Sequence, residues 1–263
     1  MKLFYPKFLL LAGCFFLLAS VGYGGNKPKR EMYRLTVYQY ATAAQETVLN
    51  TYFKNALLPA LHRMGYKKIG VFKSLANDTT AIKMIYLYMP VKGLEDQTAI
   101  AEKLNTDTAY QSAGSEYINA DYKTPPYLRM EVILLKAFPL APQMQLPNLK
   151  SPKNERVYEL RSYEGATEKM FANKMRMFNE GNEMDIFKRI NANAVFYSEV
   201  VAGSHMPNLM YMTCYENKAD REAHWKIFGS DPAWKTLSAL PEYQHNVSHI
   251  DITFLQPLEY SDF

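Results

Sequence analysis

The chain has 263 residues, of which 48% are hydrophobic and 21% are charged, a composition typical of globular proteins that excludes a wholly disordered chain. Its glycine and proline counts, 12 and 14, exclude collagen-like and low-complexity architectures. The formal net charge of +4 is too small to indicate a surface built for nucleic acid.

The first segment, residues 1–22, has the pattern of a secretory signal peptide. Lys2 and Lys7 form a basic start, residues 8–21 form an apolar run, and small residues follow. Such a run is too short to span a bilayer comfortably. We therefore expect an exported protein, periplasmic or extracellular, with no membrane span.

The same segment also contains a second addressing pattern. Residues 11–14 read Leu-Ala-Gly-Cys, which matches a bacterial lipobox and would make Cys14 the site of a lipid anchor. The apolar run continues past Cys14, which favours plain export. After cleavage near residue 22 only Cys214 remains, so no internal disulfide can form.

The remaining chain contains one pattern twice. Strands are predicted from period-two alternation, and helices from apolar residues three and four apart. In the first copy the expected elements are a strand at 33–40, a helix at 45–63, strands at 68–75 and 82–89, a helix start at 106–110 and a strand at 128–138. In the second copy they are a strand at 158–165, a helix at 168–189, strands at 193–202 and 209–215, a helix start at 230–234 and a strand at 249–255.

Each copy therefore has the order β-α-β-β-α-β, which is the ferredoxin-like split βαβ arrangement. Right-handed crossovers place both helices on one face of such a sheet and leave the other face bare. We predict an α+β fold in which two ferredoxin-like repeats, residues 31–138 and 156–263, pack sheet to sheet as a pseudo-dimeric α+β barrel. Residues 139–155 contain four prolines between Pro139 and Pro152 and lack periodicity, which indicates a linker.

The second copy resembles the NIPSNAP family. The resemblance is carried by the opening strand at 157–163, by the segment 218–225 and by Phe-Gly-Ser-Asp-Pro-Ala-Trp at 228–234. It is strong over 156–257 and weak over 31–138. It implies a dimeric α+β barrel, for which the tandem copies could supply both units. The superfamily that it implies includes haem-binding proteins, monooxygenases and lactone isomerases, and the family itself has no agreed reaction.

The register of the strands selects candidate pocket residues. We place Tyr158 and Leu160 against the helices, so that Glu159, Arg161 and Tyr163 face the barrel interior. An enclosed arginine, glutamate and tyrosine hydroxyls could orient an anionic or carbonyl-bearing ligand. The ligand-pocket candidates of the two copies are Glu159, Arg161, Tyr163, Tyr211, Tyr38 and Tyr86. The competing interpretation is that Glu159 and Arg161 pair with each other while tyrosines fill the core.

Sequence motifs for other chemistry are absent. The chain has no GxSxG, SxxK, HExxH, GxGxxG or P-loop pattern, so we expect no nucleotide cofactor and name no catalytic residue. His245 and His249 are four apart, but a strand is predicted to begin at His249, so we expect no metal site. A haem-ligating histidine, His224 or His245, is less favoured than a surface histidine. We therefore expect no cofactor of any kind.

Three functions stay open. The first is an exported protein that binds a small molecule in the barrel. The second is a cofactor-independent oxygenase or isomerase of the barrel superfamily that uses Arg161, Tyr163 and Tyr211. The third is a non-enzymatic assembly protein whose partner could be a second copy of the chain.

Overall fold

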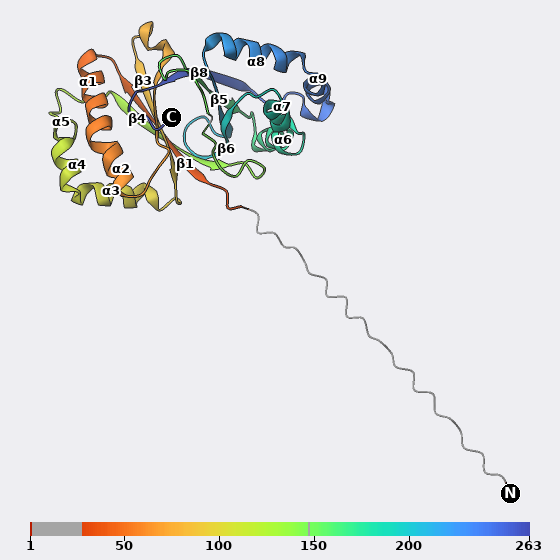
Figure 1. The fold of residues 1–263 in the computed structure, drawn as a ribbon, viewed down its shortest axis with the longest axis horizontal. Helices are drawn as coiled ribbons and strands as arrows, with labels where there is room; N and C mark the ends of the chain where they lie inside the picture. Colours follow the sequence, from red (N-terminus) through yellow and green to blue (C-terminus); the bar gives the residue numbers. More distant parts are fainter. Residues whose placement is uncertain (2–27, 147) are drawn as a thin grey trace.

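The computed structural model describes residues 1, 28–146 and 148–263 (Figure 1). The predicted signal peptide, residues 1–22, and the Cys14 lipid anchor fall on residues outside this part, apart from Met1. Among the described residues, no helix combines the length and the apolar character that crossing a membrane would require.

The element order is β-α-β-β-α-β in each half, as predicted. The first half contains β1 (Met32–Tyr40), α1 (Ala43–Tyr52), a π-helical turn (Phe53–Leu57), α2 (Leu58–Arg63), β2 (Gly70–Ser74), β3 (Lys83–Val91), α3 (Asp96–Thr106), α4 (Thr108–Ala113), α5 (Ser115–Ile118) and β4 (Arg129–Ala137). The second half contains β5 (Val157–Glu164), α6 (Glu168–Asn179), α7 (Glu183–Arg189), β6 (Ala194–Ala202), β7 (Asn208–Tyr215), α8 (Lys218–Ser230), α9 (Pro232–Ala239) and β8 (His249–Pro257).

Local capping residues explain where the helices begin. Thr42 and Gln45 form a capping box before α1, in which each side chain bonds to the backbone of the other residue. The side chains of Asp107 and Asp231 cap the first turns of α4 and α9, at corresponding places of the two halves, by accepting hydrogen bonds from backbone N–H groups. The predicted helix starts near 106–110 and 230–234 are thus present. In each half a helix already precedes this cap, α3 in the first half and α8 in the second. Asp107 and Asp231 therefore lie at the junctions between α3 and α4 and between α8 and α9.

The strands form one closed barrel in the order β1-β3-β2-β8-β5-β7-β6-β4. The halves meet at two short antiparallel seams. One pairs β2 with β8 between Phe72↔Pro257 and Ser74↔Leu255, and the other pairs β4 with β6 between Leu134↔Ala202 and Ala137↔Ser198. Figure 1 shows helices α1–α5 on one side of the barrel and α6–α9 on the other. The predicted α+β barrel of two sheets that cover each other's bare faces is confirmed.

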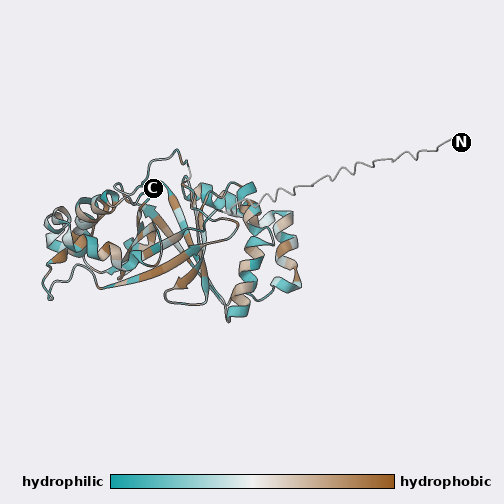
Figure 2. Ribbon diagram, turned by 90° about the horizontal axis from the view of Figure 1, so that it is seen from below, coloured by the Kyte–Doolittle hydropathy of each residue, from teal (hydrophilic) through white to brown (hydrophobic). Residues whose placement is uncertain are grey.

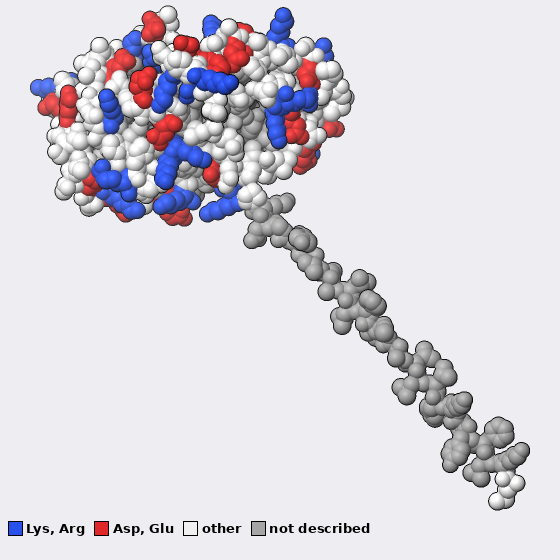
Figure 3. Space-filling view, in the orientation of Figure 1, with Lys and Arg blue, Asp and Glu red and all other residues white. Residues whose placement is uncertain are grey.

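The described part of the chain buries apolar side chains in three layers. The barrel interior draws residues from both halves, among them Tyr33, Tyr88 and Phe196, whose rings lie 4.6–5.8 Å apart between centroids. The two other clusters lie between each sheet and its own helices. Figure 2 shows this arrangement, with the strands between two sets of helices. On the face drawn in Figure 3, lysine and arginine side chains are interspersed with aspartate and glutamate.

The predicted facing of the first strand in each half is wrong. Tyr158 and Leu160 lie in the barrel interior, whereas Tyr163 packs in the cluster beneath the helices. The reason is that β5 is buried on both faces, with only Glu164 partly exposed, so alternation could not decide which face meets the helices. In the first half Tyr38 likewise packs against helices. Tyr86 faces the barrel interior, as predicted.

Candidate functional site

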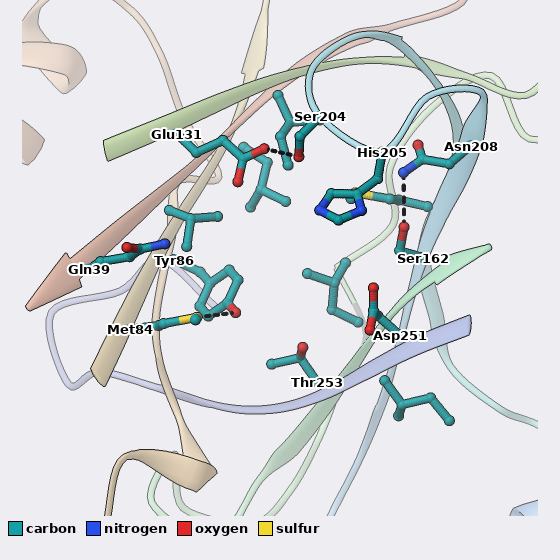
Figure 4. A pocket seen from close by; sticks show the side chains of 16 residues that line it. Gln39, Met84, Tyr86, Glu131, Ser162, Ser204, His205, Asn208, Asp251 and Thr253 are labelled. Carbon is teal, nitrogen blue, oxygen red and sulfur yellow. Dashed lines mark hydrogen bonds between the residues drawn. The ribbon is translucent and has the colours of Figure 1, made fainter. Parts of the chain in front are cut away.

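One end of the barrel is hollow. A cavity of about 360 Å³ lies where β1 and β5 end and where β3, β4, β7 and β8 begin. Antiparallel pairing brings these strand ends together, and the loop between β6 and β7 reaches over them. Figure 4 shows the polar side chains of this end, which come from all of these elements.

The cavity lining combines apolar and polar side chains. The apolar side chains are Leu35, Val37, Met84, Ile133, Leu160, Met210 and Ile252. The polar side chains are Gln39, Tyr86, Glu131, Ser162, Ser204, His205, Asn208, Asp251 and Thr253. Sites for small organic molecules likewise combine apolar surface with polar groups that orient the ligand.

Asn208 is the polar group with unused bonding capacity in this cavity. Its side chain is fully buried, and its Nδ2 donates to Ser162 Oγ at 3.0 Å. Its Oδ1 accepts no hydrogen bond from any described residue. A buried acceptor without a partner costs about 1–3 kcal/mol, which a ligand donor would recover. Tyr86 has its hydroxyl 3.1 Å from Met84 Sδ, and burial raises the pKa of this tyrosine, so it remains a neutral donor.

The charges around the cavity are acidic. Glu131 and Asp251 line it, and the described residues contribute no lysine or arginine to its lining. His205 is the other titratable group apart from Tyr86. An anionic ligand would meet carboxylates here, so of the anionic and carbonyl-bearing ligands predicted from sequence the geometry disfavours the anionic one, and it favours a neutral or cationic ligand.

Four of the predicted pocket residues lie elsewhere, beneath α8. Glu159 is fully buried and accepts a hydrogen bond from Arg161 Nε at 2.6 Å. Arg161 Nη1 donates to the hydroxyl of Tyr163 at 3.0 Å, and that hydroxyl lies 2.8 Å from the hydroxyl of Tyr211. The structure therefore brings Glu159, Arg161, Tyr163 and Tyr211 together, but on the helix-facing side of the sheet and not in the barrel.

Two side chains of α8 complete this buried group. Arg221 donates to both carboxylate oxygens of Glu159, at 2.7 and 2.9 Å, and Trp225 Nε1 donates at 2.8 Å. The Arg161 guanidinium carbon lies 3.7 Å from the centroid of the Trp225 ring, a cation–π contact. Glu159 is thus held by two cations and an indole, which anchors α8 to the sheet.

The titration behaviour of this group follows from its surroundings. Burial alone would raise the pKa of Glu159, but hydrogen bonds and charge from Arg221 and Arg161 bring it below its ordinary value. Burial raises the pKa of Tyr211 far above its ordinary range. At neutral pH Glu159 therefore stays ionised and paired with Arg161 and Arg221. This agrees with the alternative stated from sequence, in which Glu159 and Arg161 pair with each other.

Sequence reasoning missed Arg221 as a partner, and it missed the buried ion pair Lys174–Glu183, whose atoms lie 2.8 Å apart. A signal was present for Arg221, because it precedes Trp225 by four residues on a helix and so shares its face. No local sequence pattern indicated that Asn208 and His205 line a cavity. His205 lies in the loop between β6 and β7 and Asn208 directly follows it, and the position of this loop depends on the closed barrel.

An antiparallel barrel built from two βαββαβ halves, each covered by its own helices, defines the dimeric α+β barrel class. The second half is similar to the NIPSNAP family, whose model matches residues 158–262. None of the curated proteins matches the chain.

Solved structures share this fold. A candidate monooxygenase from Lactobacillus acidophilus is 14% identical with a TM-score of 0.55, and the match covers 87% of this chain and 94% of that one. An anthrone oxidase-like protein is 8% identical with a TM-score of 0.53, covering 89% and 93%. A NIPSNAP family protein from Agrobacterium tumefaciens is 18% identical with a TM-score of 0.37, covering 46% of this chain and 98% of that one. At the identities of the first two structures, the likeness shows the fold alone.

Proposed function

We propose that this protein binds a small neutral or cationic molecule in the cavity at the end of its barrel. The observation that carries the proposal is the fully buried Asn208, which lines a cavity of about 360 Å³ and whose Oδ1 has no hydrogen-bond partner among the described residues. This volume lies at the lower end of the range of small-molecule sites. A ligand of this kind would donate a hydrogen bond to Asn208 and place its apolar part against Val37 and Leu160.

The oxygenase or isomerase that would use Arg161, Tyr163 and Tyr211 loses its support. These side chains are buried beneath α8 and satisfy one another and Glu159, so no substrate in the barrel could touch them. The cavity supports binding, and we assign no reaction to it.

A variant with a blocked cavity tests the proposal. In Val37→Phe the larger ring would occupy the cavity. A library of neutral and cationic compounds is screened by thermal shift against the wild-type protein, this variant, and Ile250→Phe, where the same ring is added at an exposed position away from the cavity lining. A ligand at 100 times its Kd stabilises by about 2.7 kcal/mol, which raises Tm by roughly 5 °C or more.

We expect compounds that shift the wild type and Ile250→Phe equally and shift Val37→Phe by less than half as much. Equal shifts in all three proteins would place binding outside the cavity and contradict the proposal. If no compound shifts the wild type, the assembly role becomes the better interpretation.

We also propose that the chain is exported, on the basis of its N-terminal pattern of basic start, apolar run and small residues. Mass spectrometry of the protein purified from a secreting bacterial host measures its mature N-terminus. We expect cleavage near Gly22. A chain that begins at an acylated Cys14 would show the lipid anchor instead, and an intact Met1 would refute export.

A further inference from the structure

Carboxylates and imidazoles gather on the rim of the barrel, beside the cavity. Glu164 is the last residue of β5, and His249 lies directly opposite it at the start of β8. Asp251 is two residues further along β8, so its side chain lies on the same face of the ladder as that of His249. One potential ligand atom from each of these three residues lies within 4.8 Å of the other two.

A fourth potential ligand comes from the loop between β6 and β7. His205 Nδ1 lies 2.9 Å from Glu164 Oε1, and this buried oxygen accepts no hydrogen bond from the described residues. On the other side, His249 Nε2 lies 3.1 Å from Asp251 Oδ1. Figure 4 shows His205 and Asp251 on the same side of the cavity. Ligand atoms about 2.1 Å from a tetrahedral ion are roughly 3.4 Å from one another. Because those of Glu164, His249 and Asp251 already lie within 4.8 Å of one another, small rotations of these three side chains would bring them into place.

The charge of this group matches a divalent cation. With both imidazoles neutral, Glu164 and Asp251 supply two negative charges, and Glu131 lies across the same cavity. Within residues 28–146 and 148–263, no lysine or arginine lines the cavity to neutralise them. Two imidazole nitrogens with two carboxylate oxygens favour a transition-metal ion such as Zn²⁺ over Mg²⁺ or Ca²⁺, which prefer oxygen ligands alone.

We propose that Glu164, His249 and Asp251, with His205 as the fourth donor, bind a divalent transition-metal ion of the zinc type at the mouth of the barrel. The sequence predicted no metal site because His245 and His249, although four residues apart, do not lie on one continuous helix. The donors in fact come from three separate elements, which only pairing of β5 with β8 and the loop after β6 bring together. The site goes beyond the proposed ligand binding, and it stands whether or not the cavity holds an organic molecule.

Titration with Zn²⁺ tests this site. The full chain is freed of metal with a chelator, and binding is measured by isothermal titration calorimetry at neutral pH. We expect one Zn²⁺ per chain and a raised Tm. His249→Ala and Glu164→Gln should each weaken binding at least about tenfold. Three of the four side chains, those of His205, His249 and Asp251, are more than half exposed, so their variants should keep the Tm of the metal-free wild type.

His224→Ala is the matched control, because His224 lies on α8 beside Asp220, away from the rim. It should bind Zn²⁺ as the wild type does. Equal weakening by His224→Ala and His249→Ala, or less than half an equivalent bound by the wild type, would overturn the site. Val37→Phe should bind Zn²⁺ unchanged, so that loss of ligand binding in the cavity and loss of metal binding are distinguishable.

Discussion

Replacing Glu159 by glutamine is expected to lower the free energy of unfolding by about 3–5 kcal/mol, because it removes the counterion of two buried cations. Arg161 and Arg221 both lie within 2.9 Å of the Glu159 carboxylate, and the side chains of the two arginines are 10% and 12% exposed. A neutral amide would leave both positive charges buried and would turn one donor group toward them. Urea denaturation of wild type and variant measures the loss.

Glu222→Gln is the control for this variant. Glu222 also pairs with Arg221, at 3.0 Å, but its own side chain is 58% exposed. An exposed pair contributes about 0–1 kcal/mol, so this variant should stay close to the wild type. A loss below about 1 kcal/mol for Glu159→Gln would show that the buried network contributes little and that α8 is held by its apolar contacts.

The effect of Glu159 should also depend on pH with a definite sign. Because the folded pKa of Glu159 lies below the ordinary value of 4.5, its stabilising effect is complete above that pH. It is lost as the pH falls through the folded pKa. The difference in stability between wild type and Glu159→Gln should therefore be largest at neutral pH and should shrink below about pH 4.5. A difference that grows on acidification would contradict this assignment.

Replacing Phe263 by alanine is expected to cost about 3–5 kcal/mol, since it would open a void in the barrel core. The ring is only 4% exposed and lies 5.2 Å from the ring of Phe72, 5.9 Å from that of Tyr158 and 6.1 Å from that of Tyr88, measured between centroids. It fills the end of the barrel opposite the cavity. The midpoint and slope of urea unfolding report the loss.

Two variants accompany Phe263→Ala. Phe263→Leu keeps most of the apolar volume and should cost less than about 1.5 kcal/mol. Tyr122→Ala removes an aromatic ring that is 84% exposed and should change stability by no more than about 0.5 kcal/mol. If Phe263→Ala matched Tyr122→Ala, the segment that follows β8 would not be part of the core.

The position of the segment after β8, residues 258–263, could not be predicted, because the hydrogen bonds that hold it lead to distant parts of the chain. Ser261 Oγ accepts from the backbone N–H of Val71 at 3.0 Å, and Asp262 Oδ2 accepts from that of Ile69 at 2.8 Å. Both partners belong to the first half of the chain, almost two hundred residues away. Residues 258–263 have no periodicity, so no local pattern indicated that they enter the barrel.

The order of strands and helices and the packing of the two halves on each other were predicted from the sequence alone. Period-two and three-to-four spacings are local signals, and a βαββαβ unit with one bare sheet face must cover that face. The seams that close the barrel, β2 with β8 and β4 with β6, appear only in the structure. The segments 157–163 and 228–234 likewise indicated the similarity to the NIPSNAP family, whose model matches residues 158–262.

Only the tertiary structure decided the roles of the site residues. Because β5 is buried on both faces, the sequence could not tell whether Glu159 and Arg161 or Tyr158 and Leu160 meet the barrel interior. The choice depends on Arg221 and Trp225, which arrive from a helix some sixty residues later and supply the partners that a buried glutamate requires. The cavity and the cluster of Glu164, His249 and Asp251 arise in the same way, from strand ends that become neighbours only when the barrel closes.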